Sequence, residues 1–383
     1  MAKFLKDNGI LIAMVLLGIL MSVLSTSFRS TANLSNLILQ MCITGTLAVG
    51  MTMVILLGGI DLSVGSVIAL SGVEAALLMQ SGVNVWLAIG ITLLTGGFLL
   101  GLWNGFWIAK FNIPPFIITL GMMTISRGLA HLLTGGSTPP IADSTFEFIG
   151  NGYIPPLPSL IIIVLALAGF IYSVIAGIMR KKKYAIPIKT IEWLPNFIIG
   201  IIGFAFASWI FLSSRGSENM DRNLGIPVPA AIMAVVIFIG HFLLTNTRFG
   251  RRIYAIGGNQ EAARLSGINI NGVKMTVYAI MTALAAIGGF IAASRVSSAS
   301  PNAGEMMELD VIAAVVIGGT SLSGGSGTIK GAIIGAIFIQ IMMNGMSALS
   351  VLEPIQKVAK GVIIILAVLF DVLQKKRKST AVK

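Results

Sequence analysis

The chain is a succession of long apolar runs, separated by short segments that hold most of its charged residues. The hydrocarbon core of a bilayer is about 30 Å thick, and a helix of about 20 apolar residues crosses it. Only 10% of the residues are charged, whereas soluble domains carry about 25%. The chain has too few polar side chains to cover a water-soluble globule, so the sequence predicts an all-α, polytopic membrane protein.

Hydropathy predicts about 10 to 12 transmembrane or half-membrane helices in a single domain, residues 1–383. The predicted spans are 9–28, 38–58, 62–80, 85–109, 115–135, 157–178, 195–213, 228–245, 274–294, 308–320 joined to 327–349, and 356–374. Segment 308–320 is too short to cross, so 308–349 holds either a re-entrant half-helix and one span, or two spans. The first run has no small-residue cleavage site, so it is interpreted as an uncleaved helix rather than a signal peptide.

The net charge of +12 could suggest a nucleic-acid partner, but most of the 26 Lys and Arg residues lie at the ends of apolar runs. They cluster near the N-terminus, in 180–189, in 248–274 and in 375–383. Positive charge next to membrane spans marks the cytoplasmic side. We therefore expect both termini and the loops 179–194 and 246–273 in the cytoplasm, contact with lipid, and no nucleic-acid partner. The predicted outer loops carry Asp143, Glu147, Glu218, Asp221 and Glu305.

Two glycine-rich stretches repeat each other, "GGIDLSVGS" at 58–66 and "GGTSLSGGS" at 318–326. Lipid cannot satisfy the hydrogen-bonding groups of non-helical backbone, which survives at membrane depth only inside protein or beside a polar cavity. The repeat predicts two related halves with broken helices near their interface, a pattern typical of transporters. The predicted break residues are Gly58, Gly59, Gly65, Gly318, Gly319 and Gly325. The alternative is that these glycines only allow helices to pack closely.

Motifs for catalysis and metal binding are missing. Cys42 is the only cysteine, and the two histidines have no acidic partner at metal-ligand spacing. No glycine is followed directly by lysine, so the phosphate-binding loop of ATPases is absent. We expect no enzyme activity, no metal and no bound cofactor in this chain.

The longest inner loop, residues 246–271, contains the pattern E-A-A-x-x-x-G at Glu261, Ala262, Ala263 and Gly267. The pattern predicts a short helix from Gln260 to Leu265 that ends at Gly267. Such a helix on the inner surface would suit docking to a partner protein. The alternative is an ordinary surface loop.

Four stretches carry a resemblance to a known family: "GTLAVGMTMVILLGGIDLSVGSV" (45–67), "LGLWNGFWIAKFNIPPFIITLGMM" (100–123), "TRFGRRIYAIGGNQEAARLSGIN" (247–269) and "ELDVIAAVVIGGTSLSGGSGTIKGAIIGA" (308–336). The chain resembles the permease subunits of bacterial ATP-binding-cassette sugar importers of the ribose, xylose and galactose type. The resemblance implies a type II importer-like fold in the bacterial inner membrane and a second copy of the chain. It also implies a sugar-binding protein outside and an ATPase subunit inside, which binds ATP and Mg.

The resemblance further implies that the inner loop carries the ATPase-coupling helix, with Asn259, Glu261, Ala262, Ala263 and Gly267. The segment 179–227, with an added apolar run, is longer than in ribose or galactose permeases and is similar to an insertion in xylose permeases. D-Xylose or a related pentose is therefore the expected substrate.

A neutral sugar needs hydroxyl and amide partners along its pathway. The candidates to line that pathway are Asp61, Ser63, Asn104, Thr320, Ser321 and Ser323. A membrane serine can instead bond the carbonyl one turn back, and Asp61 can instead be the N-cap of a helix that starts at Leu62.

Two other functions compete with ATP-driven import. An ion-coupled transporter needs embedded ionisable groups, and only three residues, Asp61, Glu74 and Arg127, lie at plausible depth, without a carboxylate–histidine relay. A membrane scaffold or sensor would not need two glycine-broken helices. The inner loop favours the importer.

Overall fold

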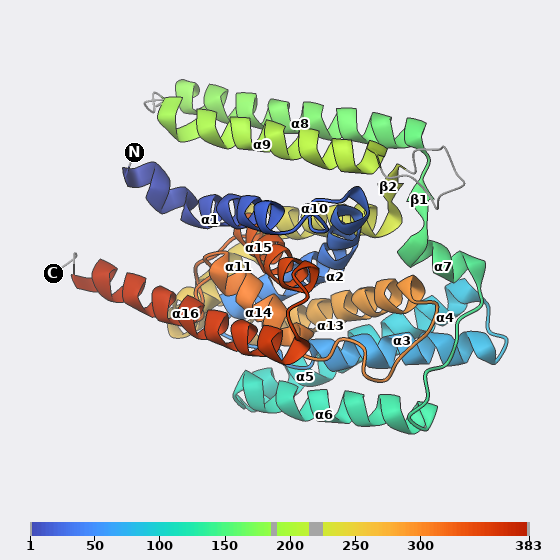
Figure 1. Ribbon diagram of the computed structural model, residues 1–383. Coiled ribbons are helices and arrows are strands. Elements are labelled where there is room, and N and C mark those ends of the chain that lie inside the picture. The colour runs from blue at the N-terminus through green and yellow to red at the C-terminus, as the bar shows by residue number, and fades with distance from the viewer. Residues whose placement is uncertain (1, 185–189, 214–224, 381–383) are drawn as a thin grey trace.

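The computed structural model describes residues 2–184, 190–213 and 225–380, and these form a bundle of helices (Figure 1). The helices are α1 Ala2–Leu24, α2 Thr31–Leu56, α3 Val64–Gln80, α4 Val85–Thr92, the π-helix η1 Leu93–Leu99, α5 Leu100–Lys110, α6 Pro115–Thr134, α7 Ser144–Asn151, α8 Pro156–Lys183, α9 Thr190–Ser213, α10 Val228–Asn246, α11 Arg248–Gly258, α12 Gln260–Leu265, α13 Ile270–Arg295, α14 Met307–Ile317, α15 Ile329–Ala348 and α16 Glu353–Thr380. Two short strands, β1 Tyr153–Ile154 and β2 Ile226–Pro227, pair antiparallel.

The predicted polytopic, all-α architecture is confirmed. Among the described residues, seven helical segments are long and apolar enough to cross a membrane: α2, α4–η1–α5, α6, α8, α10, α13 and α15. Shorter apolar stretches lie in α1, α3 and α9. The ambiguous region 308–349 takes the first of its two predicted forms, because the half-length helix α14 is followed by one full-length helix, α15.

Local sequence signals set where these helices begin. The side chains of Ser30 and Thr328 each accept a hydrogen bond from a backbone N–H in the first turn of α2 and α15. Such caps satisfy amides that have no partner inside the helix. Helices α6 and α8 instead begin with proline, and α10 has proline at its second position, where the missing N–H costs nothing because it has no partner inside the helix.

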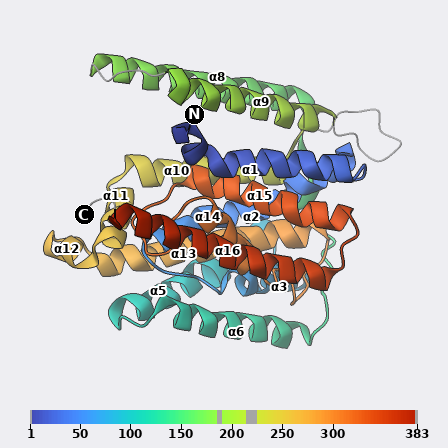
Figure 2. The same cartoon turned by 60° about the vertical axis from the view of Figure 1, so that its left-hand side comes forward.

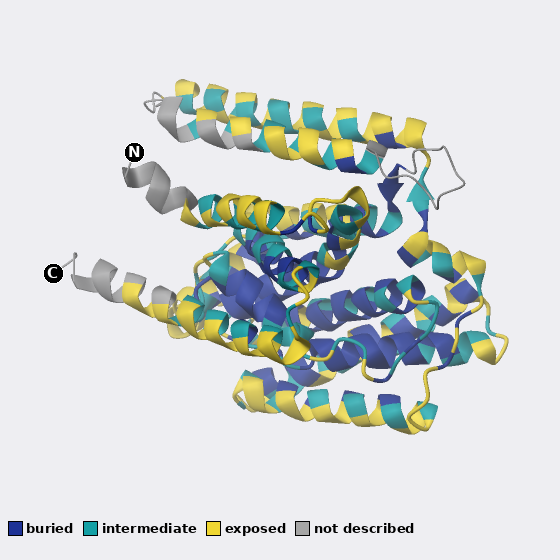
Figure 3. Ribbon diagram, in the orientation of Figure 1, coloured by how far each residue is buried: buried dark blue, intermediate teal, exposed yellow. Residues whose placement is uncertain are grey.

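Helices α2 and α13 form the centre of the bundle, and α8 and α9 lie at its edge (Figures 1 and 3). The faces of α2 and α13 are filled by buried apolar side chains and glycines, and α13 packs against α2, α3 and α5. The apolar window of α8 contains no buried residue. The predicted insertion 179–227 therefore includes the peripheral helix α9, while Glu218 and Asp221 lie outside the described residues.

Figures 1 and 2 show the start of α1, the end of α16 and the helices α11 and α12 at one end of the bundle. Helix α7 and strand β1 lie at the opposite end. The segments that the basic clusters assign to the cytoplasm thus lie on the same side of the molecule.

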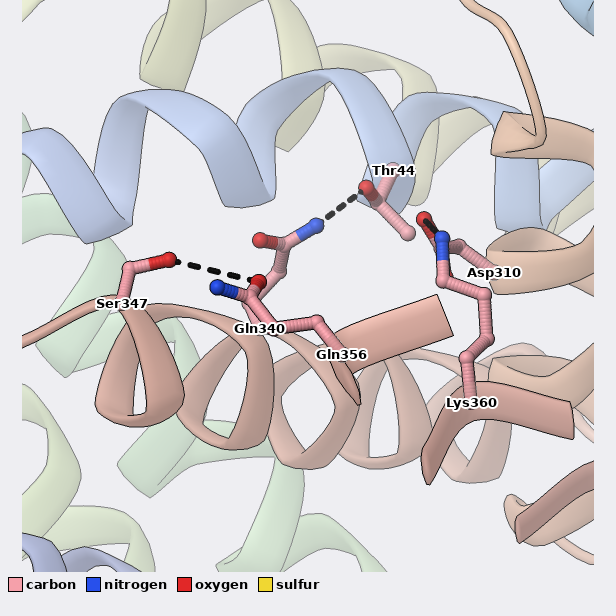
Figure 4. Close-up of polar contacts among 6 residues, drawn as sticks. All are labelled: Thr44, Asp310, Gln340, Ser347, Gln356 and Lys360. Carbon is pink, nitrogen blue, oxygen red and sulfur yellow. Dashed lines mark hydrogen bonds and ion pairs between the residues drawn. The ribbon is translucent and has the colours of Figure 1, made fainter. Parts of the chain in front are cut away.

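Polar side chains join helices inside this apolar bundle (Figure 4). Gln340 of α15 donates to the Thr44 hydroxyl of α2 over 2.7 Å. The Lys360 ammonium of α16 lies 2.8 and 2.9 Å from the two carboxylate oxygens of Asp310 in α14. Both side chains are buried, so this ion pair fixes the half-length helix α14 to the C-terminal helix.

This ion pair leads to a stability prediction. Lys360→Ala leaves the Asp310 carboxylate buried without its cation, so the free energy of unfolding should fall by about 3–5 kcal/mol. Lys357→Ala is the matched control, because Lys357 pairs with Glu353 on the exposed face of the same helix and should have a much smaller effect. Denaturant unfolding of the purified protein in detergent measures both. Equal losses in the two variants would contradict a dominant role for the buried pair.

Candidate functional site

Both predicted breaks are present, and both helices before them end in the same way. At the end of α2, Gly58 N–H donates to Ile55 O over 2.8 Å and Gly59 N–H to Val54 O over 3.0 Å. At the end of α14, Gly319 N–H donates to Val316 O over 2.9 Å and Thr320 N–H to Val315 O over 3.1 Å. Gly58 and Gly319 have φ values of 76° and 88°, the left-handed conformation that favours glycine at this position.

This geometry corrects the sequence pairing of the two stretches. The sequence aligned Gly58 with Gly318, but Gly318 is the last residue of normal helical conformation, and the equivalent of Gly58 is Gly319. Gly65 lies inside α3, so its assignment to the first break is wrong. A Cβ atom on Gly65 would collide with the Gly304 carbonyl oxygen, which is the packing role of the alternative interpretation.

The two breaks contact each other through their backbones. Gly325 N–H of the second break donates to Leu56 O at the end of α2 over 2.9 Å. A Cβ on Gly324 would lie only 2.9 Å from Leu56 O and from Gly257 O. We call the segments 56–58, 323–325 and 257–258 the glycine junction, because the backbones approach there so closely that a Cβ on Gly257, Gly324 or Gly325 would lie less than 3.0 Å from a neighbouring backbone atom.

Gly257 brings the inner loop into this junction. Gly257 and Gly258 end α11, and a Cβ on Gly257 would collide with the Leu56 carbonyl oxygen. The hydroxyl of Tyr254, one turn earlier, donates to Gly327 O of the second break over 2.8 Å. Burial raises the pKa of the Tyr254 hydroxyl, so it stays a neutral donor. Helix α11 is therefore tied to both breaks.

Helix α12 follows immediately and has the predicted bounds, Gln260–Leu265. Asn259 is its N-cap and accepts a hydrogen bond from Ala262 N–H over 2.9 Å. Gly267 ends it with φ 76°, and Ile268 N–H donates back to Ala263 O over 3.1 Å. The sequence predicted that Gly267 would end this helix, and the structure confirms it.

Helix α12 turns most of its surface outward. Ala263 is buried beneath it, whereas Glu261 and Arg264 form an exposed ion pair at 2.6 Å. Leu265 is 81% exposed and lies on the same helix as these two charged residues. The helix thus presents a mixed apolar and charged face at the surface.

Three of the six predicted pathway residues form a closed cluster beside the first break. Asp61, Ser63 and Asn104 are fully buried. Asp61 Oδ1 accepts from Ser63 N–H at 2.9 Å and from the Ser63 hydroxyl at 2.6 Å, and the Asn104 amide lies 3.5 Å from that hydroxyl. Helix α3 begins at Val64, two residues later than the alternative interpretation expected, but Asp61 still accepts the Ser63 N–H ahead of the helix, as a capping side chain does.

The cluster also contains polar atoms without partners. Asp61 Oδ2, Asn104 Oδ1 and the hydroxyl of Tyr278 are buried and accept or donate no hydrogen bond within the described part of the chain. Sequence reasoning missed Tyr278 of α13, whose hydroxyl lies against the first break, 2.5 Å from the Cβ position of Gly59, and which is far from the break in the sequence.

The other three pathway candidates lie in the second break. Thr320 and Ser321 are buried, and Ser323 is exposed. The hydroxyl oxygens of Ser321 and Ser323 are 3.1 Å apart. The glycine junction therefore joins two groups of polar residues, one closed and one reaching the surface. The described residues include no group of three or more His, Cys, Asp or Glu that could hold a metal.

Comparison with known proteins places this geometry in a family. Residues 33–368 match the family described as branched-chain amino acid transport system, permease component. The chain is 41% identical over 358 residues to the xylose transport system permease protein of Escherichia coli (strain K12), covering 92% of this chain and 87% of the relative. It is 37% identical over 368 residues to the ribose import permease protein of the same organism, covering 96% and 94%.

A second xylose transport system permease protein, from Haemophilus influenzae (strain ATCC 51907 / DSM 11121 / KW20 / Rd), is 38% identical over 356 residues, covering 92% of each chain. No solved structure matches the chain. The name of each of these relatives describes a permease protein for transport or import. The chain therefore belongs to the permease-component family of substrate transport systems and is a multi-pass translocation subunit.

Proposed function

We propose that this chain is the permease subunit of an ATP-binding-cassette importer that carries a monosaccharide, D-xylose or a related pentose, into the cytoplasm. The names of the xylose and ribose relatives support a pentose. The polar groups at the breaks support a neutral solute, since hydroxyls and amides predominate there and Asp61 is the one carboxylate among the six candidates.

The glycine junction is the observation that carries the coupling mechanism. An ATPase subunit, which binds ATP and Mg, binds to the exposed face of α12. A shift of α12 moves Gly257–Gly258. The backbone of these two residues is in close contact with the backbones of both breaks, at Leu56 and at Gly324–Gly325. The Tyr254 hydrogen bond carries the same shift to Gly327. ATP-driven motion at the inner surface thus reaches both polar groups through backbone contacts, and it reaches the second break also through the Tyr254 side chain.

The remaining parts follow from the same proposal. A second copy of the chain completes the pathway in the bacterial inner membrane, and a sugar-binding protein delivers the sugar from outside. The end of the bundle that holds both termini, α11 and α12 faces the cytoplasm.

The function and the role of α12 can be tested together in proteoliposomes that contain the permease, its ATPase and the binding protein. Wild-type protein should take up D-xylose only with ATP. Gly267→Val forces a branched side chain into left-handed backbone at a position with open space around it, so it should alter α12 at a cost of about 1 kcal/mol or more and uncouple hydrolysis from uptake. Absence of ATP-dependent uptake of any sugar in a panel would refute the proposed function.

The glycine junction predicts different outcomes for two adjacent glycines. Gly257→Ala should abolish uptake, because its Cβ collides with the Leu56 carbonyl. Gly258→Ala should leave uptake intact, because no atom lies within 4 Å of its Cβ position. Uptake assays on membranes with matched protein levels compare the two variants. Similar activity of both would show that the close approach is unimportant.

The orientation can be tested by cysteine labelling in a Cys42→Ser background. Gln260→Cys in α12 should resist a membrane-impermeant thiol reagent in intact cells, whereas Ser137→Cys at the opposite end should react, since both positions are exposed. Labelling of position 260 from outside would reverse the proposed topology. Asn219, another predicted outer position, lies outside the described residues.

A further inference from the structure

A second polar cluster lies away from the breaks, at about half the depth of the bundle. Glu74 is ten residues from the start of α3, and Thr95 is ten residues from the start of α4. With a rise of 1.5 Å per residue, Glu74 lies about 15 Å from the first break along α3, and Thr95 lies about 15 Å from the start of α4, so the cluster is between the two ends of the bundle. Thr95 belongs to the π-helix η1, a rare wide turn that is often found at functional sites.

The polar groups of this cluster converge over one glycine. The Thr95 hydroxyl contacts Glu74 Oε1. The Cβ position of Gly96 is 2.8 Å from Glu74 Oε2 and 3.1 Å from the Ser71 hydroxyl. Absence of a side chain at Gly96 therefore lets the backbone of η1 pack closely against the Glu74 carboxylate and the Ser71 hydroxyl.

Two hydroxyls of this cluster have no hydrogen-bond partner. Ser71 and Thr92 are fully buried, and neither hydroxyl is bonded to another described residue. Glu74 is half-buried and forms no ion pair within the described part of the chain. A carboxyl group at this depth is costly in contact with lipid, so its open side must face water or protein. Thr95 alone does not compensate for that cost.

We propose that Glu74, Ser71 and Thr92 form a sugar-contacting site at mid-membrane, where Glu74 accepts hydrogen bonds from hydroxyl groups of the passing monosaccharide. The carboxylate supplies acceptors for adjacent hydroxyls, and Ser71 and Thr92 supply both donors and acceptors. A neutral polyol fits because the cluster offers hydrogen bonds without a fixed cation. This inference rests on the proposed function and adds the place where the sugar is held between the two ends of the permease.

The test uses the complete transporter in proteoliposomes with saturating sugar and binding protein. Glu74→Gln keeps the shape but replaces a charge-assisted hydrogen bond with a neutral one, so the maximal uptake rate of D-xylose should fall about tenfold. ATP hydrolysis should stay close to the wild-type rate. A monodeoxy analogue that lacks the contacted hydroxyl should lose little rate in this variant, since the interaction is already absent.

Two further variants keep the test decisive. Ser71→Ala removes a hydroxyl that has no partner in the protein, so it should not impair folding, yet it should lower uptake severalfold. Glu147→Gln, in α7 at the end of the bundle, is the control and should transport normally. Wild-type uptake rates in both Glu74→Gln and Ser71→Ala would overturn the site while leaving the importer function intact.

Other results would also overturn this inference. Loss of uptake together with loss of ATP hydrolysis in a fully assembled Ser71→Ala complex would assign the cluster a structural role. Wild-type uptake that depends on a proton gradient, with the dependence lost in Glu74→Gln, would make Glu74 a proton carrier. Absence of any wild-type uptake would remove the proposed function on which the site rests.

Discussion

Backbone polar groups cannot be left unpaired in hydrocarbon, and the architecture of this permease depends on how its two broken helices meet that requirement. Each helix end satisfies its own carbonyls through two N–H bonds beside a left-handed glycine. The breaks then satisfy each other, since Gly325 N–H bonds Leu56 O. The pairing holds α2, α14 and α15 together at one end of the bundle, where non-helical backbone would otherwise be too costly.

The same requirement explains why the inner loop lies against the breaks. Close contact between three backbones leaves no room for Cβ atoms at Gly257, Gly324 and Gly325, and Gly58 has the left-handed backbone that favours glycine. A contact between backbones cannot relax by changing a side-chain rotamer, unlike a contact between long side chains. The arrangement is therefore stiff, which suits the transmission of a displacement under the proposed function.

Sequence reasoning found the features that are local. Apolar runs predicted the helices, and the E-A-A-x-x-x-G pattern predicted α12 and its end at Gly267, because capping depends on neighbouring residues. It failed where contacts are distant in sequence. Gly65 resembles a break glycine but is needed for packing against Gly304, and the π-helix at Thr95 has no signal in hydropathy. Tyr254 and Tyr278 find their places only through tertiary contacts.

The two breaks share a helix ending but differ in the length and burial of the connection to the next helix. The first connection spans 57–63, and its residue Asp61 is part of a buried cluster. The second connection is longer, from 318 to 328, and its residue Ser323 is exposed. A short, buried connection resists rearrangement, while a longer and more exposed one can change conformation at lower cost. Tyr254 bonds the longer connection, at Gly327. Under the proposed function, the first break is therefore the fixed side of the junction, and the second is the side on which motion of the inner loop acts.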